Sequence, residues 1–360
     1  MGAEGAADGQ RYAAARHGVR LALVGCGTMG RLHAGHAAAE PACRIGLFVD
    51  TDLRRAEALA ARFGGEAATD HRRALDDPQI HGVILTVPDP LHAAPALEAL
   101  AAGKHVMMEK PIAVTLADAD AVVAAAGRAE RVVFVAHVLR FRPALRRIKR
   151  LLAEGALGEP IFARYHHEHF PDLRERAWLT AADEGGVFVS GAVHHADLLR
   201  WWLGEVTAVT GHGRRVRPEY RAVGQFDHAL IVYDFASGAL GESTYSYASH
   251  QSHVRPSVEA TVTGTEGDLV QFADGAAHVY RPAGRALGLD LPPVLSLPPL
   301  GGNGLAMEVP HFVRCILGTT TPAVTPRDAR RALEIVLAAR RSAEEGRTIP
   351  VQAMASEGLP

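Results

Sequence analysis

The sequence predicts an α/β protein in which a doubly wound domain with a parallel sheet precedes an α+β domain with a large open, mainly antiparallel sheet. Two patterns predict this architecture. In residues 19–137, short apolar runs alternate with helical segments, as in βαβ units. After residue 160, several runs alternate apolar and polar residues, as strands with one solvated face do. The length of 360 residues also fits two domains of ordinary size.

The first domain is expected to contain five buried strands, because each run is short, apolar and bounded by turn residues. These strands are 19–25, 44–50, 82–87, 105–108 and 131–137. The helices expected between them are 29–39, 53–63, 95–102 and 116–128. In the helix at 53–63 the apolar residues share one face and the arginines lie opposite, which is typical of a helix packed on a sheet.

The second domain is expected to begin with a basic helix and to continue as a sheet. The helices expected here are 144–153, 194–203, 307–317 and 326–345. The expected strands are 161–169, 208–216, 228–235, 239–248, 257–264 and 268–273, and residues 282–304 are expected to form a long loop. We therefore predict a disordered N-terminal arm (1–18), a first domain (19–142) and a second domain (143–360).

The overall charge and the cysteine content exclude several classes of protein. Lys plus Arg number 38 and Asp plus Glu number 40, so the formal net charge of -2 argues against nucleic-acid or membrane-surface binding. No run approaches the roughly 20 apolar residues of a membrane span. The three cysteines are sparse and form no close pair, which argues against a disulfide framework and favours a reducing cytoplasm.

The first chemical signal is the glycine pattern G-x-G-x-x-G at Gly25, Gly27 and Gly30, with Thr28 and Met29 between the last two glycines. It follows an expected strand and opens an expected helix. Gly25 is expected to permit a tight turn, Gly27 to admit a pyrophosphate, and Gly30 to let the helix pack against the strand. The amino end of the helix would then offer free N–H groups to the phosphates. This pattern predicts a dinucleotide-binding Rossmann domain.

A carboxylate stands where a ribose would lie. Asp50 ends the second expected strand, 20 residues after Gly30. A carboxylate at that point accepts hydrogen bonds from the adenosine ribose and repels a 2′-phosphate, so NAD is favoured over NADP. Arg54 and Arg55 lie close in sequence and could soften that preference, which keeps NADP open. The competing interpretation is a plain turn in which Asp50 only caps the next helix.

Two further segments carry acid–base chemistry. Glu109-Lys110-Pro111 follows a parallel strand at the edge where ligands of open α/β sheets bind. The segment 185–203 contains the adjacent histidines His194 and His195, and a histidine is the usual acid–base group near neutral pH. A surface lysine, and histidines that cap or bury the helix, are the structural alternatives.

These motifs together resemble the Gfo/Idh/MocA family, which includes glucose–fructose oxidoreductase and inositol 2-dehydrogenase. The resemblance rests on the glycine pattern, the E-K-P tripeptide, R-F-x-P at 140–143 and the G-G…H-x-x-D-L-L block at 185–199. It extends over residues 19–350. Each motif is weak alone, and their combination is specific.

The resemblance implies a set of cofactor contacts and a chemical role for each matched residue. Contacts to NAD are implied for Thr86, Pro88, His92 and Glu109, besides Lys110 and the glycine turn. Lys110 would also contact the reacting oxygen of the substrate.

The acid–base and substrate-binding roles fall on the second domain. His194 matches the histidine that takes the hydroxyl proton, and Asp197 matches an aspartate that supports its helix. Substrate contacts are implied for His194, and we expect them for Tyr165, Trp178, Ser190 and His195. Lys110 and His194 are thus the two expected catalytic residues.

The chain departs from the family pattern at three positions. Ser190 stands four residues before His194, where the family usually has aspartate, so a negative charge is lost there and the substrate or the proton relay is expected to differ. His195 could compensate for that loss. Asp89 replaces a common asparagine, and Leu179 follows Trp178 where an arginine is frequent.

The leading hypothesis is therefore an NAD-dependent oxidoreductase that acts on a CH–OH or carbonyl carbon of a sugar, inositol or aminocyclitol. Two alternatives stay open: a redox-neutral epimerase or lyase with tightly bound NAD, and a non-catalytic NAD-binding regulator. A metal site at His166, His167 and His169, or near His250 and His253, is the less favoured interpretation of the histidine clusters, because this hydride transfer needs no metal. A homodimer or homotetramer through the second sheet is expected.

Overall fold

The computed structural model describes residues 18–168, 170–173, 177–181, 185–249, 258–281 and 294–351. The predicted disordered arm, residues 1–18, lies outside the described residues except for Gly18. The chain forms two compact units. The first contains residues up to 138 together with 304–330, and the second contains 139–303 together with the chain from 331 onward. Residues 304–330 thus belong to the first unit, whereas the predicted boundary after residue 142 placed them in the second domain.

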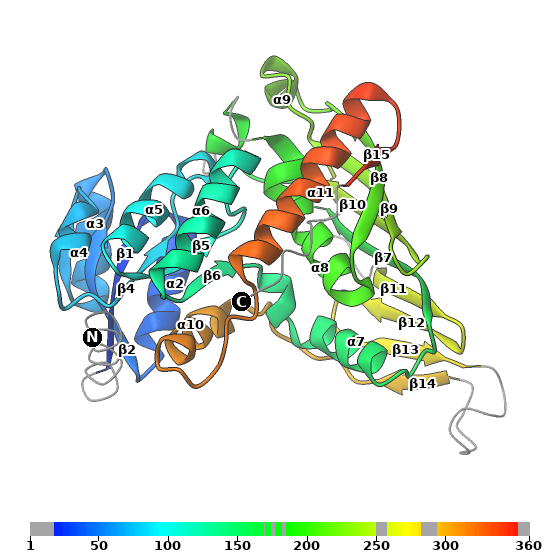
Figure 1. Ribbon diagram of the computed structural model, residues 1–360, viewed down its shortest axis with the longest axis horizontal. Helices are drawn as coiled ribbons and strands as arrows, with labels where there is room; N and C mark the ends of the chain where they lie inside the picture. The colour runs from blue at the N-terminus through cyan, green and yellow to red at the C-terminus, as the bar shows by residue number, and fades with distance from the viewer. Residues whose placement is uncertain are drawn as a thin grey trace. The chain divides into compact units, whose positions relative to one another are not determined.

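The first unit is built on a six-stranded, wholly parallel sheet in the order β3-β2-β1-β4-β5-β6 (Figure 1). Its strands are β1 (Val19–Val24), β2 (Cys43–Val49), β3 (Glu66–Ala68), β4 (Gly82–Leu85), β5 (His105–Glu109) and β6 (Val133–Ala136). The central strands β1, β4 and β5 are almost fully buried, which explains their continuous apolar sequence. The strand order reverses between β1 and β4, the position at which such sheets bind ligands.

Helices connect these strands and cover the sheet. They are α2 (Thr28–Ala38), α3 (Leu53–Phe63), α4 (Arg72–Asp76), α5 (Ala93–Ala101) and α6 (Leu116–Ala129), with short 3₁₀ turns η1 (Asp89–Leu91) and η2 (Val138–Phe141). Side chains cap the starts of two of these helices: the side chain of Asp52 accepts a hydrogen bond from the Arg54 amide at α3, and Thr115 accepts one from the Asp118 amide at α6. Residues 304–330, which also belong to this unit, contain η6 (Leu305–Met307) and α10 (Glu308–Ile316). Helix α10 packs against α2.

The second unit contains a nine-stranded sheet in the order β14-β13-β12-β11-β7-β10-β9-β8-β15. Only the pair β7 and β10 is parallel, and the other neighbours are antiparallel. The strands are β7 (Pro160–Glu168), β8 (Val206–Arg214), β9 (His228–Phe235), β10 (Leu240–Ser246), β11 (Val258–Gly264), β12 (Gly267–Phe272), β13 (Ala277–Tyr280), β14 (Val294–Leu297) and β15 (Ile349–Pro350).

Helices cover one face of this sheet and leave the other face open (Figure 1). The helices and turns are α7 (Pro143–Ala153), η3 (Ala177–Thr180), the π-helical turn η4 (Val187–Ala192), α8 (Val193–Leu203), α9 (Pro218–Ala222) and the long α11 (Pro326–Glu345). The covered face carries buried side chains such as Ala163, Tyr165 and Ile231. Alternate residues of the same strands are half-buried or exposed, as the apolar–polar alternation predicts.

The predicted fold class is confirmed, and most predicted elements occur within a few residues of their expected ends. Several short elements were not predicted from the sequence, namely β3, α4, α9, β13 and β15. The expectation of a loop over 282–304 was wrong for residues 294–297, which form the edge strand β14, while residues 282–293 lie outside the described residues. Short edge strands are defined by their partners and carry little periodicity of their own. No helix in the described part of the chain has the length and apolarity needed to cross a bilayer.

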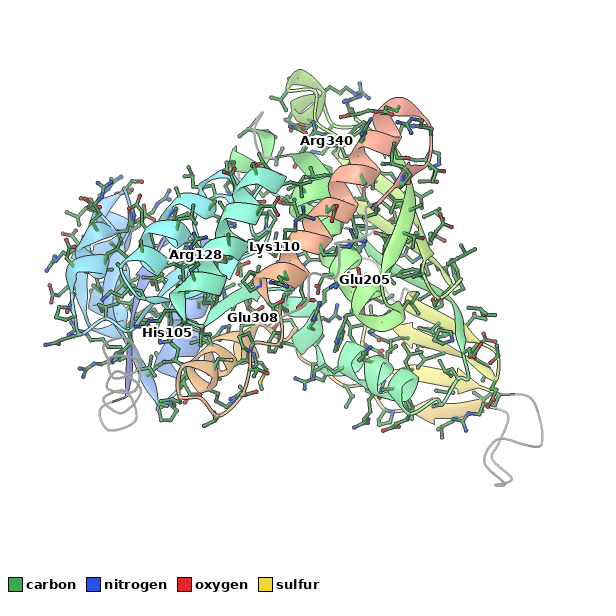
Figure 2. The ribbon with its side chains drawn as sticks, viewed as in Figure 1. His105, Lys110, Arg128, Glu205, Glu308 and Arg340 are labelled. Carbon is green, nitrogen blue, oxygen red and sulfur yellow. The ribbon has the colours of Figure 1, made fainter. Side chains whose placement is uncertain are left out.

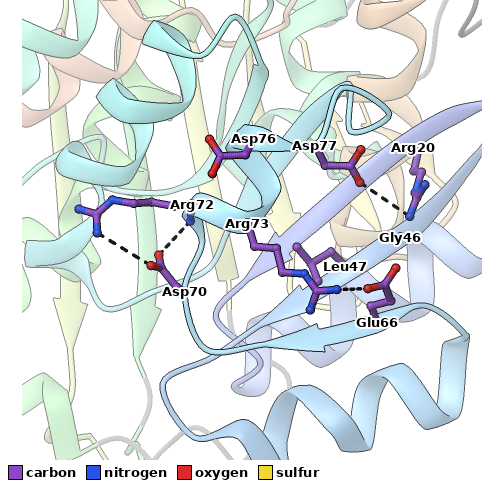
Figure 3. Close-up of a pocket in the computed structure, with 9 residues that line it drawn as sticks. All are labelled: Arg20, Gly46, Leu47, Glu66, Asp70, Arg72, Arg73, Asp76 and Asp77. Carbon is purple, nitrogen blue, oxygen red and sulfur yellow. Dashed lines mark hydrogen bonds and ion pairs between the residues drawn. The ribbon is translucent and has the colours of Figure 1, made fainter.

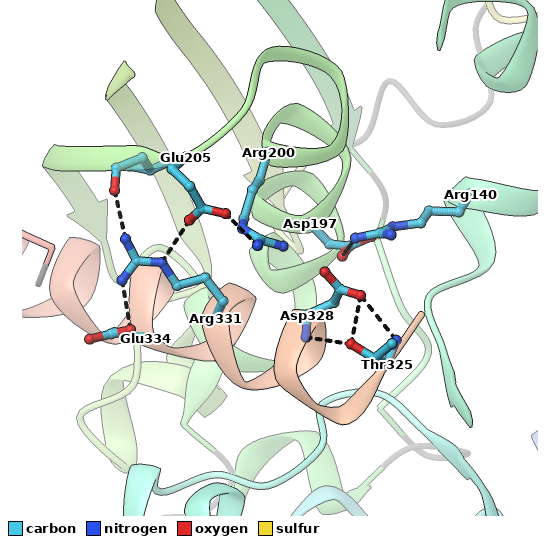
Figure 4. Close-up of polar contacts among 9 residues, drawn as sticks. Arg140, Asp197, Arg200, Glu205, Thr325, Asp328, Arg331 and Glu334 are labelled. Atoms are coloured by element: carbon cyan, nitrogen blue, oxygen red, sulfur yellow. Dashed lines mark hydrogen bonds and ion pairs between the residues drawn. The ribbon is translucent and has the colours of Figure 1, made fainter. Parts of the chain in front are cut away.

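A buried arginine ties α11 to the start of β8 (Figure 4). Arg331 is 2% exposed and donates from Nη1 to Glu334 Oε2 (2.7 Å), from Nη2 to the Val206 carbonyl (2.8 Å) and from Nε to Glu205 Oε2 (3.1 Å). Glu205 also pairs with Arg200 of α8, so one carboxylate links two helices. The same helix carries Arg340, whose Nε lies 3.1 Å from Glu344 Oε1 in a solvated pair.

We predict that Arg331→Leu lowers the free energy of unfolding by about 2–4 kcal/mol, because the buried charged hydrogen bonds from Arg331 to Glu334, Glu205 and the Val206 carbonyl are lost. Arg340→Leu, the same substitution on the same helix, should cost less than about 1 kcal/mol, because exposed pairs contribute little. Urea unfolding followed by circular dichroism measures both values. Equal losses for the two variants would contradict the role given to Arg331.

Candidate active site

The three glycines of the turn after β1 differ in how much space a Cβ atom would have. Gly25 has a φ of +97°, and a Cβ there would lie 2.6 Å from the Thr86 carbonyl oxygen. A Cβ on Gly30 would lie 2.0 Å from the Gly25 carbonyl oxygen, so only glycine lets α2 pack this close. A Cβ on Gly27 would meet no atom within 4 Å. The turn is therefore tight at both ends and open at its centre, the shape that a pyrophosphate requires.

The amino end of α2 opens onto this turn. Gly27 is the N-cap residue, and no side chain caps the helix. Thr28 and Met29 form the first turn together with Gly30, and no acidic residue is present there. Backbone N–H groups at an uncapped helix end stabilise an anion, and the helix dipole adds to this effect. The residues present thus fit a dinucleotide phosphate.

Asp50 binds the glycine turn directly. Its Oδ2 accepts the Cys26 amide at 2.8 Å, and its Oδ1 accepts the Asp52 amide at 2.9 Å. The carboxylate therefore joins the end of β2 to the turn after β1 and keeps lone pairs available for a ribose. Arg54, considered as a contact for a 2′-phosphate, instead donates to Asp52 from Nε and Nη2, both at 3.0 Å.

The ends of β4 and β5 are joined by hydrogen bonds. The Thr86 hydroxyl donates to the Gly25 carbonyl at 2.5 Å. The fully buried His92 lies between the Pro111 carbonyl (Nδ1, 2.6 Å) and the Val87 carbonyl (Nε2, 2.8 Å). Pro88, which directly follows Val87 in the chain, is exposed. His92 thus stabilises the segment after β5 against the segment after β4.

Glu109 and Lys110 stand at the carboxyl end of β5 (Figure 2). Glu109 is almost fully buried and pairs with His33 of α2, whose Nε2 lies 2.8 Å from its Oε1. Burial opposes ionisation of Glu109, but the His33 hydrogen bond and the charges of His33, Lys110 and His92 outweigh it and lower its pKa. Lys110 is half-buried, and the Lys110–Pro111 peptide bond is cis. The sequence analysis did not identify His33, because nothing local in α2 indicates which strand end it meets.

In the second unit the segment before α8 is a π-helical turn, a form often found at functional sites. It starts after Gly185 and Gly186, whose φ angles are +90° and +66°. Ser190 is buried within this turn, and His194 is half-buried as the second residue of α8. The adjacent His195, about 100° further round the helix, is fully buried.

His195 lies between two aromatic rings. Its ring centroid is 4.7 Å from that of Tyr165 and 4.9 Å from that of Tyr245. Burial, with His167 and His166 nearby, holds its pKa well below the usual histidine range, so the imidazole is neutral.

A buried ion pair fixes the start of α8. Arg140 of η2 donates to both oxygens of Asp197, from Nη2 at 2.6 Å and from Nε at 2.8 Å (Figure 4). Asp197 is fully buried and Arg140 is 7% exposed. The R-F-x-P motif and the H-x-x-D motif, 57 residues apart, thus meet in one bidentate contact that orients the helix carrying His194.

Tyr165 belongs to a buried hydrogen-bond network. Its hydroxyl donates to Glu259 Oε1 at 2.9 Å and accepts from Arg142 Nη1 at 2.9 Å, and Glu259 also pairs with Arg142. Burial and the Glu259 charge raise the pKa of Tyr165 well above its ordinary value. Trp178, by contrast, is half-buried in η3.

The surface hollow of Figure 3 lies elsewhere in the first unit. It is bordered by Arg20 at the start of β1, Glu66 at the start of β3 and Asp77 after α4. Arg73 pairs with Glu66, and Arg20 Nη2 lies 3.9 Å from Asp77 Oδ2. This is the amino edge of the parallel sheet, whereas the glycine turn and Lys110 stand at the carboxyl edge, where such sheets bind ligands.

Comparison with known proteins identifies the family. Residues 19–137 match the model of the oxidoreductase family with an NAD-binding Rossmann fold, and residues 145–270 match the GFO/IDH/MocA C-terminal domain. The chain belongs to the Gfo/Idh/MocA oxidoreductase family. It is an NAD-dependent oxidoreductase, as the glycine turn predicts.

Relatives of this oxidoreductase cover nearly the whole chain. It is 31% identical to scyllo-inositol 2-dehydrogenase (NAD(+)) of Bacillus subtilis, over 93% of this chain and 96% of that protein. It is 29% identical to D-apiose dehydrogenase of Paraburkholderia graminis, over 93% and 90%. The structure of GenD2 from gentamicin A biosynthesis, in complex with NAD, matches with 28% identity and a TM-score of 0.79, over 93% and 97%. Levoglucosan dehydrogenase shares the fold, with a TM-score of 0.83 at 24% identity, over 94% and 100%.

We predict that Gly30→Ala weakens NADH binding about tenfold or more, a loss of at least about 1.4 kcal/mol, because the new methyl group displaces the Gly25 carbonyl. Gly35→Ala on the same helix is the matched control, since a Cβ there meets no atom within 4 Å. That control should bind NADH normally. Titration of NADH fluorescence measures both affinities, and unchanged binding by Gly30→Ala would contradict the tight packing of the turn.

Proposed function

We propose that this oxidoreductase transfers a hydride between NAD and a secondary alcohol or ketone carbon of a sugar, inositol or aminocyclitol. The observation that carries the proposal is the carboxyl edge of the first sheet, where an open glycine cradle and Lys110 come from strands separated only by β4. The names of the relatives, which include inositol, apiose and 1,5-anhydrofructose enzymes, support a polyhydroxylated substrate.

Each residue at this edge would have a defined task toward the cofactor. The turn from Gly25 to Gly30 would hold the pyrophosphate with the amides of α2, and Asp50 would accept hydrogen bonds from the ribose hydroxyls. Thr86 and Pro88, at the end of β4, would line the nicotinamide side. When bound, the nicotinamide supplies the hydride acceptor or donor. The Asp50 carboxylate supports NAD as the preferred form, because it would repel a 2′-phosphate.

Two side chains would act on the substrate. The Lys110 ammonium would donate a hydrogen bond to the reacting oxygen and hold that oxygen in place. The His194 imidazole would take the hydroxyl proton in oxidation and return it in reduction. His194 suits this task because the Arg140–Asp197 pair stabilises its helix.

The remaining predicted substrate residues would shape the pocket. Trp178 and Ser190 would contact substrate hydroxyls, and Ser190 brings no negative charge to them. Tyr165 and His195 are fully buried, and the Tyr165 hydroxyl is already bound to Glu259 and Arg142. We therefore infer that Tyr165 and His195 support the pocket wall through their rings rather than through hydrogen bonds to substrate.

Lys110→Ala and His194→Ala should each lower kcat by about 10²- to 10⁴-fold while NADH still binds, because each removes a group that acts in proton transfer or orientation. The measurement is NADH formation over a panel of sugars, inositols and aminocyclitols with NAD and with NADP. The reverse reaction is measured with the matching ketones.

His212→Ala is the control for these variants, because His212 is an exposed histidine of the same unit. It should keep the wild-type kcat. Full cellular function of both Lys110→Ala and His194→Ala would instead indicate a regulator, and retained NAD without turnover of added NAD would indicate a redox-neutral enzyme.

We also propose a homodimer or homotetramer formed through the open face of the nine-stranded sheet. Strand register places Phe162, Leu240 and Tyr280 in one cross-strand row of that face, which also contains Asp234, Thr263 and Asp268. Val232 lies in the next row and Leu230 in the row after it. Leu240 is 47% exposed and Tyr280 is 38% exposed. Exposed apolar side chains on an open sheet face are typical of an interface between subunits.

Leu240→Glu should shift the molecular mass toward the monomer, because it replaces an exposed apolar side chain of that face with a charged one. Ile161→Glu is the control: Ile161 is 50% exposed on the neighbouring strand, but alternation directs it to the other side of the sheet. Light scattering after gel filtration measures the mass. A monomeric wild-type protein would refute the proposed assembly.

A cytoplasmic location is proposed on the cysteine chemistry alone. Cys26, Cys43 and Cys315 are all free thiols, and Cys26 and Cys315 are buried. Free thiols without a disulfide framework are typical of a reducing compartment.

A further inference from the structure

The first unit contains a buried carboxyl group to which the proposed reaction assigns no role. Glu308, the first residue of α10, is fully buried, and neither of its carboxylate oxygens receives a hydrogen bond from the described residues. It lies beside the His33–Glu109 pair: one imidazole nitrogen of His33 and one carboxyl oxygen each of Glu109 and Glu308 all lie within 4.8 Å of one another. Figure 2 labels Glu308 and Lys110.

Two neighbouring buried carboxyl groups cannot both hold a full negative charge without a large cost. Burial and the charge of Glu109 raise the pKa of Glu308 well above its ordinary value. The pKa of Glu109 moves the other way, because His33, Lys110 and His92 stabilise its charged form against the cost of burial. The pair therefore separates into an ionised Glu109 and a neutral Glu308, as in other carboxyl pairs whose environments differ.

We propose that Glu308 is a protonated acid whose O–H donates to the Glu109 carboxylate, and that it is a positioning residue for the adjacent Lys110. His33 holds one oxygen of Glu109 at 2.8 Å, and a carboxyl oxygen of Glu308, on α10, lies within 4.8 Å of that pair, from where its O–H would reach the carboxylate. Two donors from two different helices fix the plane of the carboxylate. The backbone at the end of β5, and with it Lys110, is fixed as a consequence. This inference rests on the proposed role of Lys110.

A divalent cation bound by the same three side chains is the competing explanation, because two carboxylates and one imidazole are common metal ligands. The geometry favours the proton. His33 Nε2 and Glu109 Oε1 already face each other at the distance of a direct hydrogen bond, whereas a metal would need both atoms to face the ion.

An infrared experiment tests the protonation of Glu308 without any turnover. The difference spectrum between the wild-type protein and Glu308→Gln should show the C=O stretch of one protonated carboxylic acid that the variant lacks. Glu345→Gln, at the solvated end of α11 where arginines lower the pKa of that carboxyl, should remove no such band. A wild-type protein without the band would overturn the proposal, whatever the catalytic role of Lys110.

Kinetics test the positioning role. Glu308→Leu, which has no donor, should lower kcat about 10- to 100-fold, because a displaced reacting group costs that much. Glu308→Gln should keep kcat close to the wild-type value, because its amide still donates to Glu109. NADH affinity and melting temperature are measured in parallel to separate positioning from unfolding.

Three results would overturn the inference. The first is equal loss of kcat in Glu308→Gln and Glu308→Leu, since the amide donor would then have no effect. The second is normal kcat in Glu308→Leu. The third is one equivalent of bound Mn²⁺ that Glu308→Gln abolishes. Normal turnover by Lys110→Ala would refute the proposed function instead and would leave the infrared result standing.

Discussion

The site depends on one constraint: every strand of a parallel sheet ends at the same edge. Because β1, β4 and β5 are neighbours, the turn at Gly25, the Thr86 hydroxyl and Lys110 meet there although the sequence separates them by some 85 residues. The hydrogen bonds from Thr86 to Gly25 and from His92 to the two neighbouring carbonyls then hold these strand ends together. Close packing at Gly30 completes the arrangement by holding α2 against it.

Buried charge follows the same pattern in both units. In the first, the His33 hydrogen bond and the nearby charges of His33, Lys110 and His92 lower the pKa of Glu109, while burial and the Glu109 charge raise the pKa of Glu308 beside it. In the second, Arg140 and Asp197 form a bidentate pair at the base of α8. Each buried pair joins segments distant in sequence and lies one to three residues from a proposed catalytic group. Such pairs contribute orientation, whereas their net contribution to stability is small or negative once desolvation is counted.

The sequence predicted the Rossmann unit well, because its signals are local. Buried parallel strands are continuous apolar runs, and the glycine spacing carries its own steric logic. The second unit was harder to predict: β14 lies in a segment expected to be a loop, and no element was predicted at 187–192, where the π-helical turn forms. His33 and Glu308 were not predicted as site residues, because their roles depend on contacts with side chains of other elements.

The amino-acid sequence alone predicted the cradle for a dinucleotide and favoured NAD, because the glycine turn and Asp50 belong to one βαβ unit. Its resemblance to the family indicated the lysine and the histidine that are expected to act. Tertiary structure decided which buried groups carry charge. In the folded chain, residues 304–330 belong to the first unit, and Glu308 lies beside Glu109. The Tyr165 hydroxyl donates a hydrogen bond to Glu259, and His195 lies between aromatic rings. The physical reason is that desolvation and Coulomb energy depend on distance in space, which residue spacing along a chain does not encode.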